Sequence, residues 1–167
     1  MTRIRPAEAA DVPQMTALYN HYVEHTAFTF DVEPWSVERR LEWFDRFDAT
    51  GPHRVLVAEE AGRVVGFAWS GQWRSRPAYA TSVETSVYCL DGETGRGVGT
   101  ALYTALLAVL EAESLRRAFA VITLPNEASE RLHRRFGYSQ VGVLSEAGRK
   151  FGRFWDVSIW QRALGDG

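Results

Sequence analysis

Apolar side chains along the chain recur at two spacings, and the changes between these spacings separate helices from strands. Helix-like patterns cover residues 12–25, 37–47, 100–113 and 126–136. Two-residue alternation and short apolar runs predict strands at residues 3–6, 53–60, 63–73, 78–90, 116–124, 138–148 and 153–164. The predicted order is one strand, two helices, three strands, and then a helix, a strand, a helix and two strands.

Several element ends carry local signals. Asp11, followed three residues later by Gln14, predicts a capping box at the start of the first helix. Ser36 predicts the N-cap of the second helix, and Gly137 predicts the end of the last one. An Ala-Gly pair at residues 61–62 separates two strand-like runs and therefore predicts a hairpin.

The order of elements indicates the fold class. Consecutive strands predict an antiparallel meander, whereas the strand–helix–strand unit across residues 79–123 predicts a parallel crossover. We therefore expect an α/β fold with a single mixed, mostly antiparallel twisted sheet of about seven strands, flanked by about four helices. The 167 residues suit one substantial core and contain no repeat or linker, so residues 1–167 are expected to form a single domain.

Composition narrows the functional classes. Apolar residues make up 46% of the chain, which argues against disorder. The net charge is −2 and there is no basic run, which argues against a partner that is a nucleic acid or an anionic membrane. Cys89 is the single cysteine, so no intrachain disulfide can form. Without a signal-peptide pattern or an apolar run of spanning length, the expected location is the cytoplasm.

The run "DGETGRGVGTALY" places a glycine-rich turn between a strand and a helix. The first N–H groups of a helix have no internal partner, so this arrangement can bind an anion. A plain loop, in which glycines only serve turn geometry, explains the spacing equally well. Two familiar nucleotide motifs do not fit, because Val98 stands where a P-loop has lysine and the glycines read G-x-G-x-G rather than G-x-G-x-x-G.

The turn Thr94-Gly95-Arg96-Gly97-Val98-Gly99 resembles the acyl-CoA turn, Gln/Arg-x-x-Gly-x-Gly/Ala, of the GNAT superfamily of N-acetyltransferases. Thr94 departs from that pattern, and Arg96 offers a charge in compensation. The stretches "NHYVEHTAFTF", "VETSVY", "RLHRRFGY" and "FGRFWDVSIWQ" extend the resemblance, in order, to the phosphinothricin and methionine sulfoximine acetyltransferase branch. This resemblance implies the GNAT fold, acetyl-CoA as co-substrate, an amino-acid acceptor and a homodimer.

Glu84 is the candidate general base. Acetyl transfer needs a neutral amine, and amino groups with pKa values of roughly 8 to 10 are mostly protonated at neutral pH. A partly desolvated carboxylate has a raised pKa and is a better base. Alternation places Glu84, Ser86 and Tyr88 on one face of their strand. A solvated face or an arginine pair would explain Glu84 without catalysis, but the resemblance implies the catalytic role.

His133 is the second catalytic candidate. The resemblance implies that it serves the leaving thiolate, whereas a lone helix histidine is more often a packing or surface residue. The four histidines show no metal-ligand spacing with carboxylates or cysteine, so no metal is expected.

Further cofactor contacts follow from the resemblance. The backbone of Val87, Tyr88 and Cys89 is expected to hold the pantetheine arm and to polarise the thioester, and the Cys89 thiol is interpreted as a packing group. The residues expected to bind the phosphates and the cofactor arm are Thr94, Gly95, Arg96, Gly97, Val98, Gly99, Thr100, Asn126 and Ser129. Asn126 is also a plausible N-cap, and both roles are compatible.

The acceptor side is expected around "WRSRPAY". Guanidinium groups bind carboxylate and phosphinate in bidentate fashion, so Arg74 and Arg76 can clamp an anionic amino acid, and Tyr79 can add a hydroxyl. Surface arginines on a solvated loop are the alternative. Phe30 is a candidate for an apolar wall of the site or for the core. Residues 150–156, "KFGRFWD", resemble a stretch near the family's site and subunit interface.

The function expected from the sequence is transfer of an acetyl group from acetyl-CoA to the amino group of an L-amino-acid-like substrate, of the phosphinothricin, methionine sulfoximine or methionine sulfone type. Two alternatives remain open. One is a protein N-terminal or small-amine acetyltransferase with the same CoA site. The other is a non-catalytic acyl-CoA-binding sensor domain, against which Glu84 and the basic pair argue.

Overall fold

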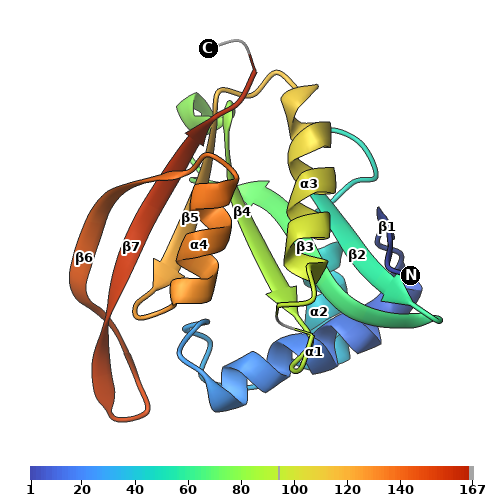
Figure 1. Ribbon diagram of the computed structural model, residues 1–167, viewed down its shortest axis with the longest axis horizontal. Helices are drawn as coiled ribbons and strands as arrows, with labels where there is room; N and C mark the ends of the chain where they lie inside the picture. Colours follow the sequence, from blue (N-terminus) through green and yellow to red (C-terminus); the bar gives the residue numbers. More distant parts are fainter. Residues whose placement is uncertain (94, 166–167) are drawn as a thin grey trace.

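The computed structural model describes residues 1–93 and 95–165, in which strands and helices follow the predicted order (Figure 1). The strands are β1 (Arg3–Pro6), β2 (Arg54–Glu60), β3 (Arg63–Gln72), β4 (Ser82–Cys89), β5 (Arg117–Thr123), β6 (Ser139–Lys150) and β7 (Arg153–Ala163). The α-helices are α1 (Val12–His25), α2 (Val37–Phe44), α3 (Val98–Glu111) and α4 (Glu127–Arg135). Short 3-10 helices, η1 and η2, cover Ala9–Asp11 and Pro77–Tyr79.

All strands belong to one seven-stranded sheet with the spatial order β1-β2-β3-β4-β5-β7-β6. Neighbouring strands are antiparallel, except that β4 and β5 are parallel. The helix α3 makes the connection between these two parallel strands. The structure therefore confirms the predicted mixed, mostly antiparallel sheet with one parallel crossover.

The parallel pair β4–β5 is short. Its strands are joined at three positions, Ser82↔Arg117, Val83↔Ala118 and Glu84↔Phe119. Beyond Glu84 the two strands diverge, as Figure 1 shows, while β4 stays paired with β3 and β5 stays paired with β7. The sheet thus consists of two halves that separate into a V-shaped gap.

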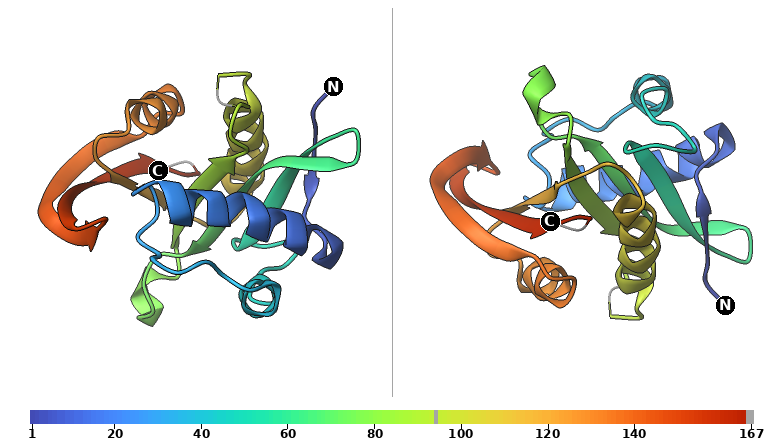
Figure 2. Two further views of the ribbon diagram at one scale, coloured as in Figure 1. Left: turned by 90° about the horizontal axis from the view of Figure 1, so that it is seen from below. Right: turned by 90° about the horizontal axis from the view of Figure 1, so that it is seen from above.

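Helices cover both faces of the sheet. Figure 2 shows α3 and α4 on one face, and α2 on the opposite face together with the loop that carries η2. Fully buried side chains of α3 such as Leu102 and Leu106 form the larger core, and Met15 of α1 belongs to the second core on the α1/α2 face. Gly66 lets α3 approach β3, because a Cβ at this position would lie 2.9 Å from Val98 Cγ1.

Most local predictions are confirmed. The Ser36 hydroxyl accepts a hydrogen bond from the Arg39 backbone N–H at 3.1 Å, which caps α2. Residues 61–62 turn the chain between β2 and β3 with positive φ angles at both positions. Gly137 follows α4 with φ of +79° and so ends that helix in the left-handed region.

The predicted capping box at the first helix is wrong. Asp11 precedes α1, but its side chain makes no cap bond. Its carboxylate instead accepts two hydrogen bonds from the Arg5 guanidinium, at 2.7 and 2.8 Å. The Gln14 side chain accepts from the backbone N–H of Val64 at 2.9 Å, so it fastens α1 to β3. Both polar side chains thus bond to residues of strands, β1 and β3, and not to their own helix. Local sequence does not reveal such partners.

Several predicted boundaries shift by two to four residues. α2 ends at Phe44 rather than residue 47, and β4 begins at Ser82 rather than residue 78 because Pro77–Tyr79 form a 3-10 turn. α3 begins two residues early, at Val98, because Gly97 takes φ of +87° and acts as its N-cap. The early start brings the helix N-terminus into the glycine turn itself.

Candidate active site

Beyond Glu84, the edge of β4 that faces the gap offers backbone groups that are not paired with a neighbouring strand. The Leu90 N–H donates to Val65 O at 2.8 Å, and positions along an antiparallel pair alternate between bonding across the pair and pointing away. By this alternation, the N–H and C=O groups of Val87 and Cys89 point away from β3. The Tyr22 hydroxyl donates to Cys89 O at 2.5 Å, which agrees with that orientation. Backbone donors and acceptors therefore line one side of the gap.

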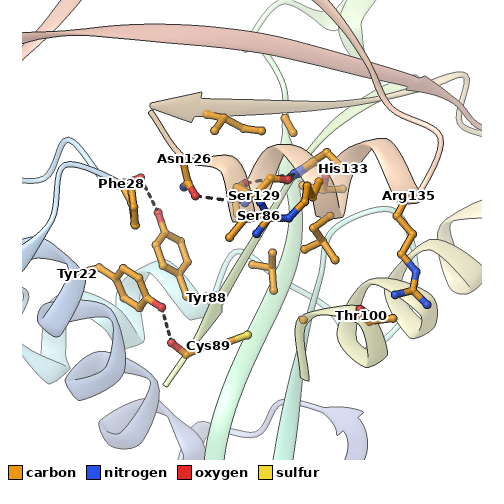
Figure 3. Close-up of a pocket in the computed structure, with 18 of the residues that line it drawn as sticks. Tyr22, Phe28, Ser86, Tyr88, Cys89, Thr100, Asn126, Ser129, His133 and Arg135 are labelled. Carbon is orange, nitrogen blue, oxygen red and sulfur yellow. Dashed lines mark hydrogen bonds between the residues drawn. The ribbon is translucent and has the colours of Figure 1, made fainter. Parts of the chain in front are cut away.

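The gap opens into a cleft of about 570 Å³. Its walls come from β4, β5, α4 and the turn before α3, as Figure 3 shows for the labelled side chains. The predicted site residues that line it are Val87, Tyr88, Cys89, Gly95, Gly97, Gly99, Thr100, Asn126, Ser129 and His133. The structure thus brings residues 87–100, from β4 to the first turn of α3, together with residues 126–133 of α4 in one cleft.

The N-terminus of α3 meets the cleft at the glycine turn. Gly95 and Gly97 have φ angles of +86° and +87°, a region that favours glycine. No side chain caps α3, so its first N–H groups remain open to an anion. Gly99 lies inside the helix and has no positive φ, while Val98 is buried in the core. Thr94, predicted to contact phosphate, lies outside the described residues.

Arg96 does not line the cleft. Its guanidinium forms an ion pair with Glu93 and lies 3.9 Å from a Glu60 carboxylate oxygen. Two carboxylates therefore engage the charge that was expected to compensate for Thr94. Glu93 itself lines the cleft, so the Arg96 pairing also neutralises a carboxylate beside the anion site.

Glu84 lies at the vertex of the V, at the last position where β4 and β5 are paired. It shares a strand face with Tyr88, which belongs to the core on the α1/α2 side. Its side chain is half-buried, and burial raises the pKa of its carboxyl group above the ordinary value of 4.5. The direction of this shift suits a general base.

His133 is buried, with 3% of its surface exposed, and both of its ring nitrogens are engaged. Nδ1 lies 2.7 Å from the Ser129 carbonyl oxygen, and Nε2 lies 2.9 Å from the Tyr103 hydroxyl. Burial lowers the pKa of His133 to about 4. The neutral ring therefore donates from Nδ1 and accepts at Nε2, a state that does not favour the predicted role as proton donor at neutral pH.

Asn126 and Ser129 lie at the N-terminus of α4. The Asn126 side chain accepts from the Ser129 backbone N–H at 3.2 Å, so the predicted N-cap is confirmed. The Ser129 hydroxyl lies 3.3 Å from His133 Nδ1, on the cleft side in Figure 3. Burial raises the pKa of the Cys89 thiol to about 11, so this thiol stays protonated and is suited to packing.

The predicted acceptor residues lie on the other face of the sheet. Arg74, Arg76 and Tyr79 are exposed on the loop around η2, on the side that also carries α2 (Figure 2). Trp73 anchors this loop by stacking on Phe119 with ring centroids 4.4 Å apart. Phe119 pairs with Glu84 across the sheet, so the loop is fixed next to the vertex.

Phe30 lies at the far end of the V. Its ring covers Gly148 of β6 so closely that a Cβ there would lie 2.1 Å from Phe30 Cε2. Nearby, the buried Lys150 ammonium donates to Thr29 O at 2.9 Å. The α1–α2 loop, residues 26–36, is thereby fastened to the β6–β7 hairpin.

The cleft also contains residues that the sequence did not predict, and two of them are informative. Tyr22 of α1 and Arg135 of α4 both line the cleft. Arg135 lies four residues beyond Arg131 on α4, and this helical spacing was the available signal for a cleft-facing basic pair. Tyr22 had no comparable signal, because its contact with Cys89 joins segments 67 residues apart.

The cleft suits acetyl-CoA. Open helix N–H groups beside two glycines fit a pyrophosphate, and an unpaired strand edge fits the amide-containing pantetheine arm. Residues 1–93 and 95–165 contain no group of three or more side chains able to hold a metal ion. No helix in the described part of the chain is long and apolar enough to cross a membrane.

Residues 4–159 match the family described as acetyltransferase (GNAT) domain. The chain is a GNAT acetyltransferase. Acetyl-CoA is accordingly its co-substrate, and the enzyme is an acetyl-CoA-dependent N-acetyltransferase. This family match agrees with the fold, with the glycine turn and with the resemblance found in the sequence.

Relatives of this acetyltransferase are similar over nearly their whole length. A phosphinothricin N-acetyltransferase of Streptomyces coelicolor is 49% identical over 97% of this chain and 96% of its own. An L-methionine sulfoximine/L-methionine sulfone acetyltransferase of Pseudomonas paraeruginosa is 36% identical over 96% of this chain and 94% of its own. A solved phosphinothricin acetyltransferase from Sinorhizobium meliloti, in complex with acetyl-CoA, superposes with a TM-score of 0.94 at 32% identity and covers 99% of this chain and 90% of its own.

Proposed function

We propose that this acetyltransferase acts on the amino group of L-amino acids of the phosphinothricin, methionine sulfoximine or methionine sulfone type. The observation that carries the proposal is the position of Glu84. This half-buried carboxylate with a raised pKa stands at the vertex of the V, next to the loop that exposes Arg74 and Arg76. A base next to a loop that exposes two arginines suits an acceptor with both an amine and an anionic group. Relatives named for such acceptors support the proposal.

The proposed roles follow from the two faces of β4. Acetyl-CoA, when bound, supplies the acetyl group as a thioester. Glu84 takes a proton from the acceptor ammonium group, and its raised pKa increases its strength as a base. The backbone N–H groups of Val87 and Cys89, on the gap side of β4, are positioned to donate to a carbonyl oxygen in the cleft. Arg74, Arg76 and Tyr79 hold the anionic end of the acceptor, with Phe30 as an apolar wall.

For His133 we propose a positioning role in the step that releases the CoA thiolate. The neutral ring bonds to Ser129 O and to the Tyr103 hydroxyl, which fixes α4, and with it the Ser129 hydroxyl, at the cleft wall. A histidine with a pKa of about 4 is almost entirely deprotonated at pH 7, so it is a poor proton source there.

The remaining proposals concern the whole chain. We propose a single domain over residues 1–167, a cytoplasmic location where acetyl-CoA is available, and a homodimer. The outer strand β6 is exposed along most of its length and carries apolar side chains that are about half exposed: Val141, Val143 and Leu144. An exposed apolar edge strand of this kind is usually covered, and a second copy of the chain is the occupant that we propose.

Replacing Glu84 by glutamine tests the function directly. We expect Glu84→Gln to lower kcat by about 100-fold, in the range of general-base catalysis, while the Kd for acetyl-CoA changes little. Release of the CoA thiol is measured against the three amino acids named above, small amines and peptides. Glu24→Gln, an exposed position on α1, is the matched control.

Three results would argue against the proposal. Wild-type turnover by Glu84→Gln would show that Glu84 is not the general base. Faster release of thiol with peptides or simple amines than with the amino acids would indicate the alternative acceptor classes. Binding of acetyl-CoA without release of thiol for any acceptor would instead indicate a sensor domain.

A further inference from the structure

Arg40 of α2 is a buried cation whose guanidinium lacks hydrogen bonds at two of its nitrogens. Only 1% of the surface of this residue is exposed. Within residues 1–93 and 95–165, neither Nε nor Nη2 has a hydrogen-bond partner. A charge that is taken out of water without such partners usually lowers the stability of a protein. Its position therefore points to a role other than stabilising the fold.

Aromatic rings surround this guanidinium. The Cζ atom of Arg40 lies 4.3 Å from the ring centroid of Tyr19, 4.1 Å from that of Trp35 and 4.8 Å from that of Trp43. Cation–π attraction is stronger at a buried site than in water, so the rings offset part of the lost solvation. Burial lowers the pKa of Arg40 to about 10, so the guanidinium stays protonated at neutral pH. One charge thereby holds together rings from α1, from α2 and from the loop between them.

Two of these rings also hold the α1–α2 loop in place. The Tyr19 hydroxyl and the Trp35 Nε1–H donate to the same carboxylate oxygen of Asp31, at 2.6 and 2.9 Å. The Tyr19 hydroxyl also lies 2.6 Å from Thr29 Oγ1. Thr29 and Asp31 are the two neighbours of Phe30 in the chain. The buried guanidinium is thus connected, through two rings, to the residues on either side of the proposed wall of the acceptor site.

We propose that Arg40 is a positioning residue for the acceptor substrate, which fixes the Tyr19 and Trp35 rings and thereby the part of the α1–α2 loop that carries Phe30. A planar guanidinium stacks on aromatic faces, whereas an ammonium group is a compact point charge, so arginine suits this task better than lysine. Arg40 does not itself line the cleft, and it acts through the rings. The inference rests on the proposed function, in which Phe30 is a wall of the acceptor site.

Kinetics of the full-length enzyme test the proposal. Arg40→Met removes the charge and leaves a flexible apolar side chain that fills part of the space. We expect it to raise the KM for the amino acid by about five- to tenfold, while kcat and the Kd for acetyl-CoA change less than about twofold. The matched control is Arg39→Met, because Arg39 also lies over the Trp35 ring, at 3.9 Å, but is exposed. The control should leave all three constants within about twofold of wild type.

Hydrogen exchange of the enzyme without any acceptor examines the loop directly. The backbone N–H groups of Asp31 and Trp35 bond to side chains, at 3.2 and 2.8 Å, and these bonds should open more often when the rings are released. In Arg40→Met, we therefore expect amides of residues 26–36 to exchange about tenfold faster, while those of β4 keep their wild-type protection. Should Arg40→Met not fold, Arg40→Lys provides the same comparison, because it keeps the charge but loses the stacking plane.

Three outcomes would overturn the proposal. They are an unchanged KM in Arg40→Met, equal increases in KM in Arg40→Met and Arg39→Met, and a fall in kcat or in acetyl-CoA affinity as large as the rise in KM. The last would indicate a general loss of structure. Failure of the proposed function has a different signature, because the wild-type enzyme would then release thiol faster with peptides or simple amines. The KM comparison is in that case made with the faster acceptor, and the exchange experiment needs no acceptor at all.

Discussion

Burial acts in opposite directions on the two titratable residues predicted to be catalytic, Glu84 and His133. It raises the pKa of Glu84, because the charged carboxylate is the form that loses solvation. It lowers the pKa of His133 to about 4, because there the protonated form is the charged one. Burial thus strengthens the proposed base at the vertex and keeps the imidazole in the cleft wall neutral.

The shift at His133 predicts how stability depends on pH. Its folded pKa of about 4 lies below the ordinary value of 6.5, so the stability that it contributes is complete above pH 6.5 and is lost as the pH falls toward 4. The total is on the order of 3 kcal/mol. Urea unfolding of wild type and His133→Asn should show a difference in unfolding free energy that shrinks from pH 7 to pH 4. Curves that stay parallel over this interval would contradict the assignment.

At the scale of elements, the contact between the α1–α2 loop and β6 has a clear geometric test. A Cβ on Gly148 would lie 2.1 Å from Phe30 Cε2, and the Phe30 ring is 38% exposed and free to swing outward. Gly148→Ala should therefore displace the ring at a cost of about 1 kcal/mol, the low end for overpacking. If Phe30 walls the acceptor site, the KM for the amino acid should rise while the Kd for acetyl-CoA stays the same.

The control for this prediction lies in the same strand. Gly142→Ala adds the same methyl group where nothing lies within 4 Å, so both constants should stay unchanged. Combining Gly148→Ala with Phe30→Ala should remove the steric part of the effect. A Gly148→Ala enzyme with wild-type stability and KM would show that the contact is without consequence.

The sequence predicted helix ends correctly where the signal for the end lies in the helix itself. Ser36, Asn126 and Gly137 act on their own helix ends, and these predictions are confirmed. Predictions about side chains with long-range partners were less successful. Gln14 bonds to β3 rather than to its own helix, and that partner lies on another strand, which neither spacing nor propensity reveals. Arg96 pairs mainly with Glu93, three residues before it in the same turn, and more distantly with Glu60 of β2.

The same limit applies to the site as a whole. Residues grouped in one strand or turn, such as Val87 to Cys89 and the glycines before α3, were predicted to lie together and do line one cleft. Arg135 was missed because its position opposite α3 depends on how β5 diverges from β4. That divergence is a property of the assembled sheet and has no local signal in the chain.

For the whole molecule, the important feature is that the V is bridged at both ends. Three paired positions join β4 and β5 at the vertex. At the open end, Lys150 donates to Thr29 O, and Phe30 covers Gly148. The two halves of the sheet are thus connected on either side of the cleft, which leaves the two faces of the sheet as the routes of access.

Those two faces carry different chemistry, and this predicts the kinetic order of the reaction. The glycine turn opens toward α3 and α4, whereas Arg74 and Arg76 lie on the face of α2. Since neither ligand crosses the path of the other, each should bind the free enzyme. The CoA product should compete with acetyl-CoA but inhibit non-competitively against the amino acid, and calorimetry should detect the amino acid binding alone. Parallel double-reciprocal lines, or binding of the amino acid only after CoA, would contradict this expectation. Because β4 and β5 separate beyond three paired positions, the two substrates are expected to bind in random order.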